Sequence, residues 1–393
     1  MTAIPTIDRS MNQTPIRDDL SREVYSILGV PIDAIEMPSV LDAIDAAAAH
    51  GTPFLMSTPN LNFLVNSQTD PEFRESLLLS DLCPADGMPI IWIARLLGVP
   101  IKRRIAGSDI FEALKPRPRL GGPLKIFLFG STEQVAATAC ERLNYGSIGL
   151  KCVGWLCPGF VDVDALSEDG LIDQVNGSNA DFLVAALGAK KGQLWLKRNQ
   201  ERLQVPVRAH LGATINFQAG TVMRAPDVVQ RMGLEWLWRI KEEPSLFQRY
   251  WHDGIVLLRL LLTRVIPAAI DARRGRSRLV PGRHDFVTVL AQKDRVATLH
   301  VSGDATAGAV PKAIVAFRAA AASQKPVAVD LSQTRTVDAR FLGLFLMLRK
   351  QLKGRGARLK FLGVSTRLKR QFRLNGLEYL LSSGEESNVN ALR

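Results

Sequence analysis

One aspartate in this chain stands at the edge of a strongly apolar run. The stretch from Cys83 to Ile110 reads CPADGMPIIWIARLLGVPIKRRIAGSDI, with Asp86 beside a glycine and three consecutive cations, residues 102–104, downstream. Apolar surroundings raise the pKa of a carboxyl group, which suits a general base, and a basic loop suits a departing anion. The alternative interpretation is a turn followed by a buried helix and a solvated charge cluster.

The motifs of the commonest catalytic machines are absent from the sequence. It has no P-loop, no G-x-S-x-G elbow and no H-E-x-x-H, and its five histidines are scattered. Asp162 and Asp164 form a D-x-D pair of the kind that many sugar transferases use to hold a metal. Their setting, GFVDVDALSEDG, is more typical of a loop that caps a helix. We therefore expect no metal and no other cofactor.

The elements that position these residues are predicted from short apolar runs that end in glycine and lead into helical patterns. Strands are predicted at residues 53–57, 124–129, 181–187 and 207–211, and a helix at 70–80. This alternation predicts an α/β domain, a Rossmann-like and largely parallel sheet with flanking helices. Ligands bind at the carboxyl ends of such strands, where the turns at Gly130 and Gly188 lie.

These pieces together resemble the WecG/TagA/CpsF-type transferases, glycosyltransferase family 26. The resemblance rests on T-x-N, D-G after a leucine-rich helix, R-x-A-G-S-D, A-G-x-x-x-R-A-P and G-L-E-W, in that order over about 230 residues from Val24 to Trp251. It implies inverting, metal-independent transfer of a sugar from a UDP-sugar to a polyprenyl-diphosphate-linked glycolipid acceptor in bacterial exopolysaccharide or cell-surface glycan synthesis. The sugar implied is of the N-acetylmannosamine type or a related hexose.

The resemblance also implies roles for individual residues. Asp86 matches the general base, Thr58 and Asn60 match a polar pair beside it, and Arg104 matches the cation near the donor diphosphate. The residues expected to bind substrate are Gly130, Ser131, Gly188, Lys191, Gln193, Asn216, Arg239 and Arg249.

Two departures from the family pattern put the exact sugar in doubt. Gly192 stands where the pattern has glutamine, for which Gln193 is a candidate substitute, and Asn216 stands where it has aspartate. One alternative is therefore a glucosyl-, mannosyl- or glucuronosyltransferase acting on a longer lipid-linked oligosaccharide. Another is a degenerate scaffold that binds a nucleotide-sugar without turning it over.

The charge of the chain favours an anionic partner. The formal net charge is +12, and residues 224–283 contribute twelve Lys and Arg against six Asp and Glu, a net of +6. Trp and Leu are interleaved with these cations, which suits a membrane interface. A core-packing helix pair with a solvated basic face remains the alternative.

No nucleic-acid-binding motif is present, and no uncharged apolar run reaches the ~20 residues that span a bilayer. We expect a cytoplasmic protein, peripheral at the inner face of the cell membrane.

A smaller α/β pattern follows residue 284. The sequence VAVDLSQTRTVDARFLGLFLMLRKQLKGRGARLKFLGV resembles the STAS domain of anti-sigma-factor antagonists. Where those carry a phosphorylated serine, this chain has Ala339 and Arg340, so phosphorylation at this position is chemically excluded. We interpret the domain as a docking or regulatory module for a protein partner. The alternative is a domain kept for stability or for a homo-oligomer.

These patterns divide the chain into consecutive parts. We predict a disordered lead-in (1–22), a catalytic domain (23–223), a helical, basic aromatic appendage (224–270), a linker (271–283), the STAS-like domain (284–383) and a tail (384–393). The four cysteines are sparse and mostly in apolar context, so we expect all four to be reduced.

Overall fold

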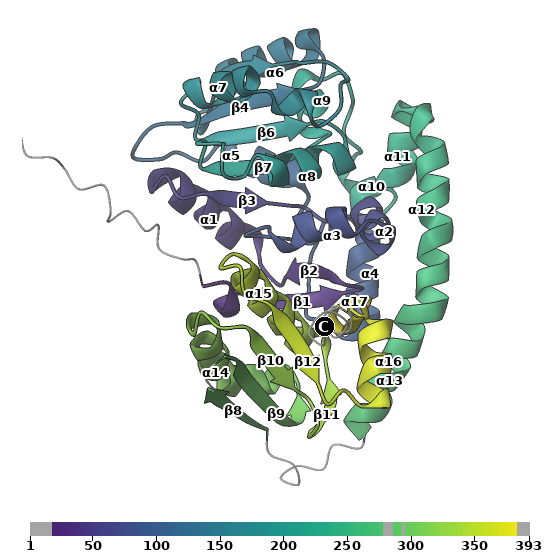
Figure 1. Cartoon of the computed structure of the whole chain (residues 1–393). Helices are drawn as coiled ribbons and strands as arrows, with labels where there is room; N and C mark the ends of the chain where they lie inside the picture. The colour runs from purple at the N-terminus through teal and green to yellow at the C-terminus, as the bar shows by residue number, and fades with distance from the viewer. Residues whose placement is uncertain (1–17, 278–285, 293–294, 383–393) are drawn as a thin grey trace, which may run out of the picture.

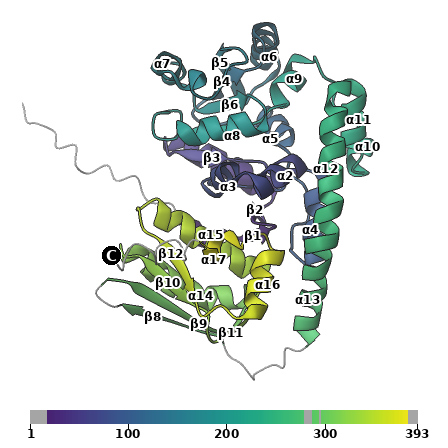
Figure 2. The ribbon, with the colours of Figure 1, turned by 45° about the vertical axis from the view of Figure 1, so that its right-hand side comes forward.

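Two α/β units joined by a long helical segment make up the protein. The computed structural model describes residues 18–277, 286–292 and 295–382 (Figure 1). The long helix α12–α13 runs along one side of both units, as the turned view in Figure 2 also shows. The predicted class, a parallel α/β domain with a second, smaller α/β domain, is confirmed.

The N-terminal unit is built on a five-stranded sheet in the order β3-β7-β6-β4-β5. The strands are β3 (Phe54–Met56), β4 (Leu124–Gly130), β5 (Leu150–Leu156), β6 (Phe182–Ala186) and β7 (Val207–His210). Every pairing is parallel. The chain passes from β4 to β5 on one side of β4 and then to β6 on its other side. The direction in which successive strands are added therefore reverses between the carboxyl ends of β4 and β6, which is the switch point of the sheet. That point is where open α/β sheets bind ligands.

Helices cover both faces of this sheet, so its strands are apolar on both sides. One face packs on α1 (Met37–Ala49), α5 (Gly107–Leu114), α6 (Glu133–Gly146) and α9 (Thr214–Ala219). The other packs on α7 (Asp169–Gly177) and α8 (Ala189–Arg198). There the buried Trp195 stacks on Phe129 with ring centroids 4.2 Å apart.

Three helices follow or flank the end of β3. They are α2 (Leu61–Thr69), α3 (Pro71–Leu78) and α4 (Met88–Leu97). Asp70 caps α3 by accepting a hydrogen bond from the Phe73 amide at 3.0 Å, so the predicted helix at 70–80 is confirmed. Between α3 and α4, residues 82–84 run parallel to β3 on the side away from β7, and the Ser57 amide donates to the Leu82 carbonyl at 2.9 Å.

The basic segment is helical, as predicted. It comprises α10 (Asp227–Arg231), α11 (Glu235–Glu242), α12 (Phe247–Leu260), a π-helical turn (Leu261–Val265) and α13 (Ile266–Ser277). The predicted linker at 271–283 is wrong for residues 271–277, because α13 continues through them: Gln371 donates to Asp271 at 3.2 Å. Residues 278–283 lie outside the described part. No helix of the described residues is long and apolar enough to cross a membrane.

The C-terminal unit is a second five-stranded sheet with four helices. Its strands are β8 (Val287–Gln292), β9 (Ala297–Ala305), β10 (Val327–Asp330), β11 (Thr334–Val337) and β12 (Leu359–Leu362), and its helices are α14 (Val310–Ala322), α15 (Ala339–Lys353), α16 (Thr366–Leu374) and α17 (Tyr379–Ser382). Only β8 pairs antiparallel. Helix α15 is buried along most of its length because it packs on its own sheet and on the N-terminal unit.

The two units meet where α15 crosses a hairpin of β1 (Val24–Ile27) and β2 (Val30–Asp33). At the crossing, a side chain at Gly343 would come within 2.7 Å of the Val24 carbonyl carbon, so only glycine fits. Arg340 donates to the Val24 carbonyl at 3.1 Å. The predicted disordered lead-in is wrong for residues 18–22: Asp19–Ser21 form a 3-10 helix whose Leu20 is buried in the C-terminal core. Residues 1–17 and 383–393 lie outside the description.

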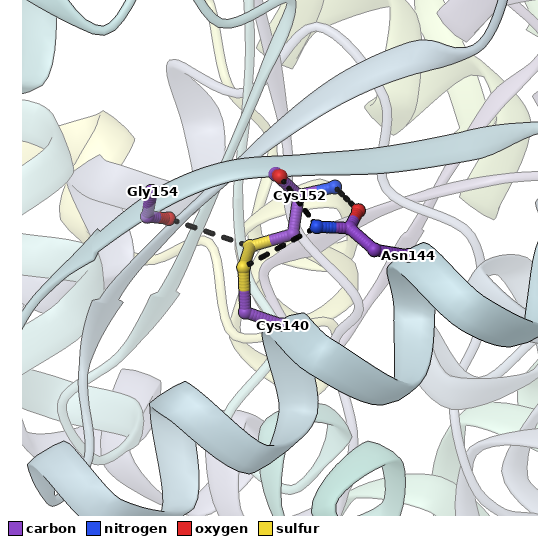
Figure 3. Close-up of a disulfide and its surroundings, with 4 residues drawn as sticks. All are labelled: Cys140, Asn144, Cys152 and Gly154. Carbon is purple, nitrogen blue, oxygen red and sulfur yellow. Dashed lines mark hydrogen bonds between the residues drawn. A yellow bond between two sulfur atoms is a disulfide. The ribbon is translucent and has the colours of Figure 1, made fainter.

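The cysteines depart from their prediction. Cys140 on α6 and Cys152 on β5, twelve residues apart, form a disulfide (Figure 3). The Asn144 side chain makes two hydrogen bonds to the backbone of Cys152. It accepts from the Cys152 amide at 2.8 Å and donates to the Cys152 carbonyl at 3.1 Å. The expectation that all four are reduced is wrong for these two, because α6 packs directly on β5. Cys83 and Cys157 are free, and burial raises the pKa of Cys83 to about 12.

Candidate active site

Most of the predicted site residues lie along one edge of the N-terminal sheet, since parallel strands end at the same edge. Thr58 follows β3, Gly188 follows β6, Gly130 ends β4 and Ser131 comes directly after it. Gly130 has φ +98°, and a Cβ there would lie 2.6 Å from the Ala186 carbonyl oxygen. The turn between the ends of β4 and β6 therefore requires glycine.

Asp86 reaches this edge because residues 82–84 extend the sheet beside β3. Its amide donates to the Pro59 carbonyl at 2.9 Å, which holds it against the loop of Thr58 and Asn60. The residue keeps partial contact with solvent while protein atoms surround its carboxyl group. Burial raises the pKa of Asp86 to about 7, the charge of Glu235 adds to this, and Arg104 and Arg224 act against it. A carboxyl group in this state suits proton abstraction near neutral pH.

Thr58 and Asn60 occupy different settings. Thr58 is buried, and a Cβ on Gly107 would lie 3.5 Å from its hydroxyl oxygen, so α5 closes over it. Asn60 caps α2, because its side-chain oxygen accepts from the Phe63 amide at 3.1 Å. The amide nitrogen of Asn60 is thus the group it has to offer a substrate.

Arg104 lies in an ion-pair network that links three separate motifs. Its guanidinium forms an ion pair with Glu235 and donates a hydrogen bond to the side-chain oxygen of Gln230 at 2.8 Å. It also lies 3.8 Å from Asp109, which pairs with Arg224. The network joins R-x-A-G-S-D to A-G-x-x-x-R-A-P and G-L-E-W. Sequence reasoning assigned no role to Arg224 or Glu235, although their motifs carried the signal.

The start of α8 contributes further polar groups. Lys191 donates to the Val161 carbonyl at 2.7 Å and so ties α8 to the loop after β5. Gln193 is fully buried, and its side-chain oxygen accepts from the Ser57 hydroxyl at 3.0 Å. Gln193 therefore faces the end of β3, next to Thr58.

Residues 25–269 match the glycosyl transferase WecG/TagA/CpsF family, and residues 288–382 match the STAS domain described as Mlab, STAS domain. The chain belongs to the WecG/TagA/CpsF family. It carries a STAS domain at its C-terminal end.

One relative of this WecG/TagA/CpsF transferase is the N-acetylglucosaminyldiphosphoundecaprenol N-acetyl-beta-D-mannosaminyltransferase of Bacillus spizizenii (strain ATCC 23059 / NRRL B-14472 / W23). The two are 25% identical over 199 residues, 51% of this chain and 74% of the relative. Among solved structures, the SsGBP and GDP complex matches 66% of this chain and 90% of its own, with 11% identity and a TM-score of 0.20. So low a score carries no argument, and the fold rests on the strand order described above.

Three predicted substrate-binding residues of the transferase lie elsewhere. Asn216 is half-buried on α9, where its carbonyl accepts from the Thr221 amide at 3.1 Å. Arg239 pairs with Glu243 and lies over the Phe217 ring, 5.2 Å from its centroid. Arg249 is exposed on α12. Among the described residues, no contact brings Arg239 or Arg249 to Asp86 or Arg104, and the cation beside Arg104 in the network is Arg224.

The D-x-D pair of the transferase lies in a turn, as predicted. Asp162 accepts from the Ala165 amide at 2.8 Å, and Asp164 pairs with Arg198. Within the described ranges, no three His, Cys, Asp or Glu side chains are grouped so as to hold a metal ion.

In the STAS domain of the transferase, the start of α15 contacts the N-terminal unit. Asp338 caps α15 by accepting from the Phe341 amide at 2.9 Å. Arg340, one of the two residues that stand where a serine was expected, donates to the carbonyls of Val24 and Arg22 at 3.1 and 3.0 Å. The N-terminal unit therefore covers the first turn of α15.

Proposed function

We propose that this protein is an inverting glycosyltransferase that moves a sugar from a UDP-sugar to a polyprenyl-diphosphate-linked acceptor in bacterial cell-surface glycan synthesis. The observation that carries the proposal is the setting of Asp86. Its backbone is bonded to the loop of Thr58 and Asn60, and its carboxyl group has a raised pKa on which the charges of Arg104 and Arg224 act. Family membership supports glycosyl transfer, and the Bacillus relative supports the acceptor class. The donor sugar proposed is of the N-acetylmannosamine type or a related hexose.

The reaction is a single displacement at the anomeric carbon. The acceptor oxygen forms a bond to that carbon, the bond to the UDP oxygen breaks, and the acceptor proton passes to Asp86. UDP leaves with the electron pair of the broken bond. A base with a pKa near the working pH is best matched to this proton transfer.

The charge that grows on UDP is met by the Arg104–Arg224 network. Arginines presented in a partly buried site stabilise a developing anion, and we propose that they supply the positive charge that a metal ion supplies in other transferases. Arg104 is paired with Glu235 and bonded to Gln230, so the diphosphate has to compete with these two side chains. Binding of the donor is therefore coupled to the position of α10 and α11.

The nucleotide is proposed to lie at the switch point of the sheet. There the turns at Gly130 and Gly188 precede α6 and α8. In the described residues no side chain caps either helix start, and the first amides of a helix are suited to an anion. Lys191, on the first turn of α8, adds a cation close by.

The acceptor is proposed to arrive from a membrane surface at the inner face of the cell membrane. A stripe of apolar side chains, each 41–65% exposed, follows α12–α13: Phe247, Trp251, Ile255, Leu258, Leu262, Ile266 and Ile270. The π-helical turn holds one residue more than an α-helical turn, so the stripe, spaced by three or four residues, stays on one face. These side chains are exposed, which favours the membrane interpretation over the core-packing alternative.

The stripe has a counterpart beside the base. Trp92 and Leu96 on α4 are 43% and 40% exposed, and α4 begins directly after Gly87. Gly233, between α10 and α11, packs against Met88 and Trp92. A lipid surface on these residues would present a lipid-linked hydroxyl close to Asp86.

The test is transfer from a panel of UDP-sugars to isolated polyprenyl-diphosphate-linked acceptor. We expect one donor to be used by the native chain, and transfer by Asp86→Asn to be about 10²- to 10⁴-fold slower. Transfer of a glucosyl, mannosyl or glucuronosyl group only to a longer oligosaccharide would establish the alternative substrate. UDP binding without turnover of any donor would establish the scaffold and overturn the proposal.

A further inference from the structure

The first turn of α8 has no room for a side chain at residue 192. A Cβ on Gly192 would collide with the imidazole of His210, 2.9 Å from its Cγ and 3.0 Å from its Nε2. His210 is the last residue of β7, and β7 pairs with β3 so that Ala209 lies opposite Met56. His210 therefore stands beside Ser57 at the carboxyl edge, and its ring takes the volume that a side chain at 192 would occupy.

Two unpaired nitrogens are buried at this place. His210 is 6% exposed and Gln193 is 0% exposed, and neither side-chain Nε2 has a hydrogen-bond partner among the described residues. The oxygen of Gln193 is already held by Ser57. Buried polar atoms without partners are rare in folded proteins, and two of them on neighbouring elements indicate a ligand that pairs with both.

The chemistry of the pair favours an uncharged ligand group. Burial lowers the pKa of His210 to about 4, with no charged side chain acting on it, so its imidazole is neutral at physiological pH. A carboxamide is neutral as well. Such groups pair well with a hydroxyl or an amide, and they supply no countercharge for a buried carboxylate.

We propose that His210 and Gln193 form the subsite that reads an uncharged hydrogen-bonding group of the donor sugar, a hydroxyl or an N-acetyl group, and rejects uronic acids. The inference rests on the proposed transfer reaction. It makes His210 a specificity-determining residue at the place where residue 192 carries no side chain, and Ser57 connects this subsite to Thr58.

The experiment compares His210→Leu with His210→Gln, whose amide nitrogen reaches the position of the imidazole Nε2. Binding of UDP-N-acetylmannosamine, UDP-glucose and UDP-glucuronic acid is measured by calorimetry without acceptor, and kcat/KM is measured with it. We expect His210→Leu to weaken the preferred neutral donor about 5- to 10-fold, the loss of one neutral hydrogen bond, and to narrow its preference over UDP-glucuronic acid. His210→Gln retains the preference, and the exposed His50→Leu leaves it unchanged.

Stability separates this role from a structural one. Because the unpaired imidazole is costly in the free protein, His210→Leu should melt at or above the native temperature. A lower melting temperature with an unchanged donor ratio would overturn the inference. If the native chain transfers no sugar, the proposed function fails, and the calorimetric donor ratios still decide the role of His210.

A double-mutant cycle checks the geometry. Gly192→Ala alone should lower the melting temperature, and combining it with His210→Ala should relieve the collision. Additive effects of the two substitutions would show that the ring does not lie over residue 192, and would also overturn the inference.

Discussion

Two carboxylates on one short segment, Asp81 and Asp86, are handled in opposite ways. Burial acts to raise the pKa of both, but Lys350 of the STAS domain and the Leu55 amide reverse the effect at Asp81, whose pKa is lowered. At Asp86 burial prevails and the pKa rises to about 7. A buried acid with its full set of partners holds structure together, whereas one left short of partners is ready for a proton.

The largest expected effect is on catalysis. Asp86→Asn keeps the shape of the side chain and removes the base, so we expect kcat to fall about 10²- to 10⁴-fold. The assay is transfer of a labelled sugar to the lipid-linked acceptor. Asp173→Asn, an exposed carboxylate on α7, is the matched control and should keep native activity. Native activity in Asp86→Asn would remove the distinction between the two acids.

The opposite effect is expected at the structural acid. Lys350 donates to Asp19 at 2.9 Å and to Asp81 at 2.8 Å, so Lys350→Met takes the cation away from Asp81 and leaves Asp19 paired with Arg22. We expect about 3–5 kcal/mol lower free energy of unfolding, measured in urea. The control Lys353→Met breaks an exposed pair with Glu75 and should cost less than about 1 kcal/mol. Equal losses in both variants would show that the STAS domain does not brace this segment.

Membrane docking is expected to depend on the stripe of α12. Replacing Trp251 and Leu258 with Glu should weaken flotation with anionic vesicles at least about 10-fold, since two apolar contacts are lost and two anions added. Val289→Glu on β8 changes an apolar residue that is 53% exposed, against 58% for Leu258, and should bind as the native chain does. Undiminished flotation of the double variant would contradict the proposed membrane face.

The smallest effect is on the pKa of the base. The charge of Glu235 raises the pKa of Asp86, so Glu235→Gln should lower it and move the acid limb of the rate profile a few tenths of a pH unit downward. Glu243→Gln, whose charge pairs with Arg239, is the control. A shift of the acid limb to higher pH would show that Glu235 affects the pKa of Asp86 mainly by holding Arg104 in place, and not through its own charge.

The parts of the fold with a local signal could be predicted from the sequence. The strands at the sheet centre, the helix Val310–Ala322 and the loop with Thr58 and Asn60 follow from apolar periodicity, glycine turns and short motifs. The hairpin β1–β2 and the 3-10 helix Asp19–Ser21 could not, because their stability comes from packing on α15.

The contacts that define the site are long-range, and single-sequence reasoning has no signal for them. Arg104 and Glu235 are 131 residues apart, and Lys350 and Asp81 are 269 apart. A histidine at the end of a buried strand gives the same sequence signal whether it packs in the core or binds a ligand. Only the structure shows that the ring of His210 occupies the space beside Gly192.

The pH dependence of transfer tests the central claim most directly. With Asp86 as the base, kcat/KM of the native chain should rise about tenfold per pH unit up to a pKa near 7 and then level off. The free energy of unfolding should change in the opposite direction. Because the pKa of Asp86 is raised in the folded chain, the native chain should lose stability as pH rises from about 4 to about 7, and Asp86→Asn should not show this loss. A rate profile that is flat between pH 5 and 8, or one that Asp86→Asn reproduces, would contradict the account.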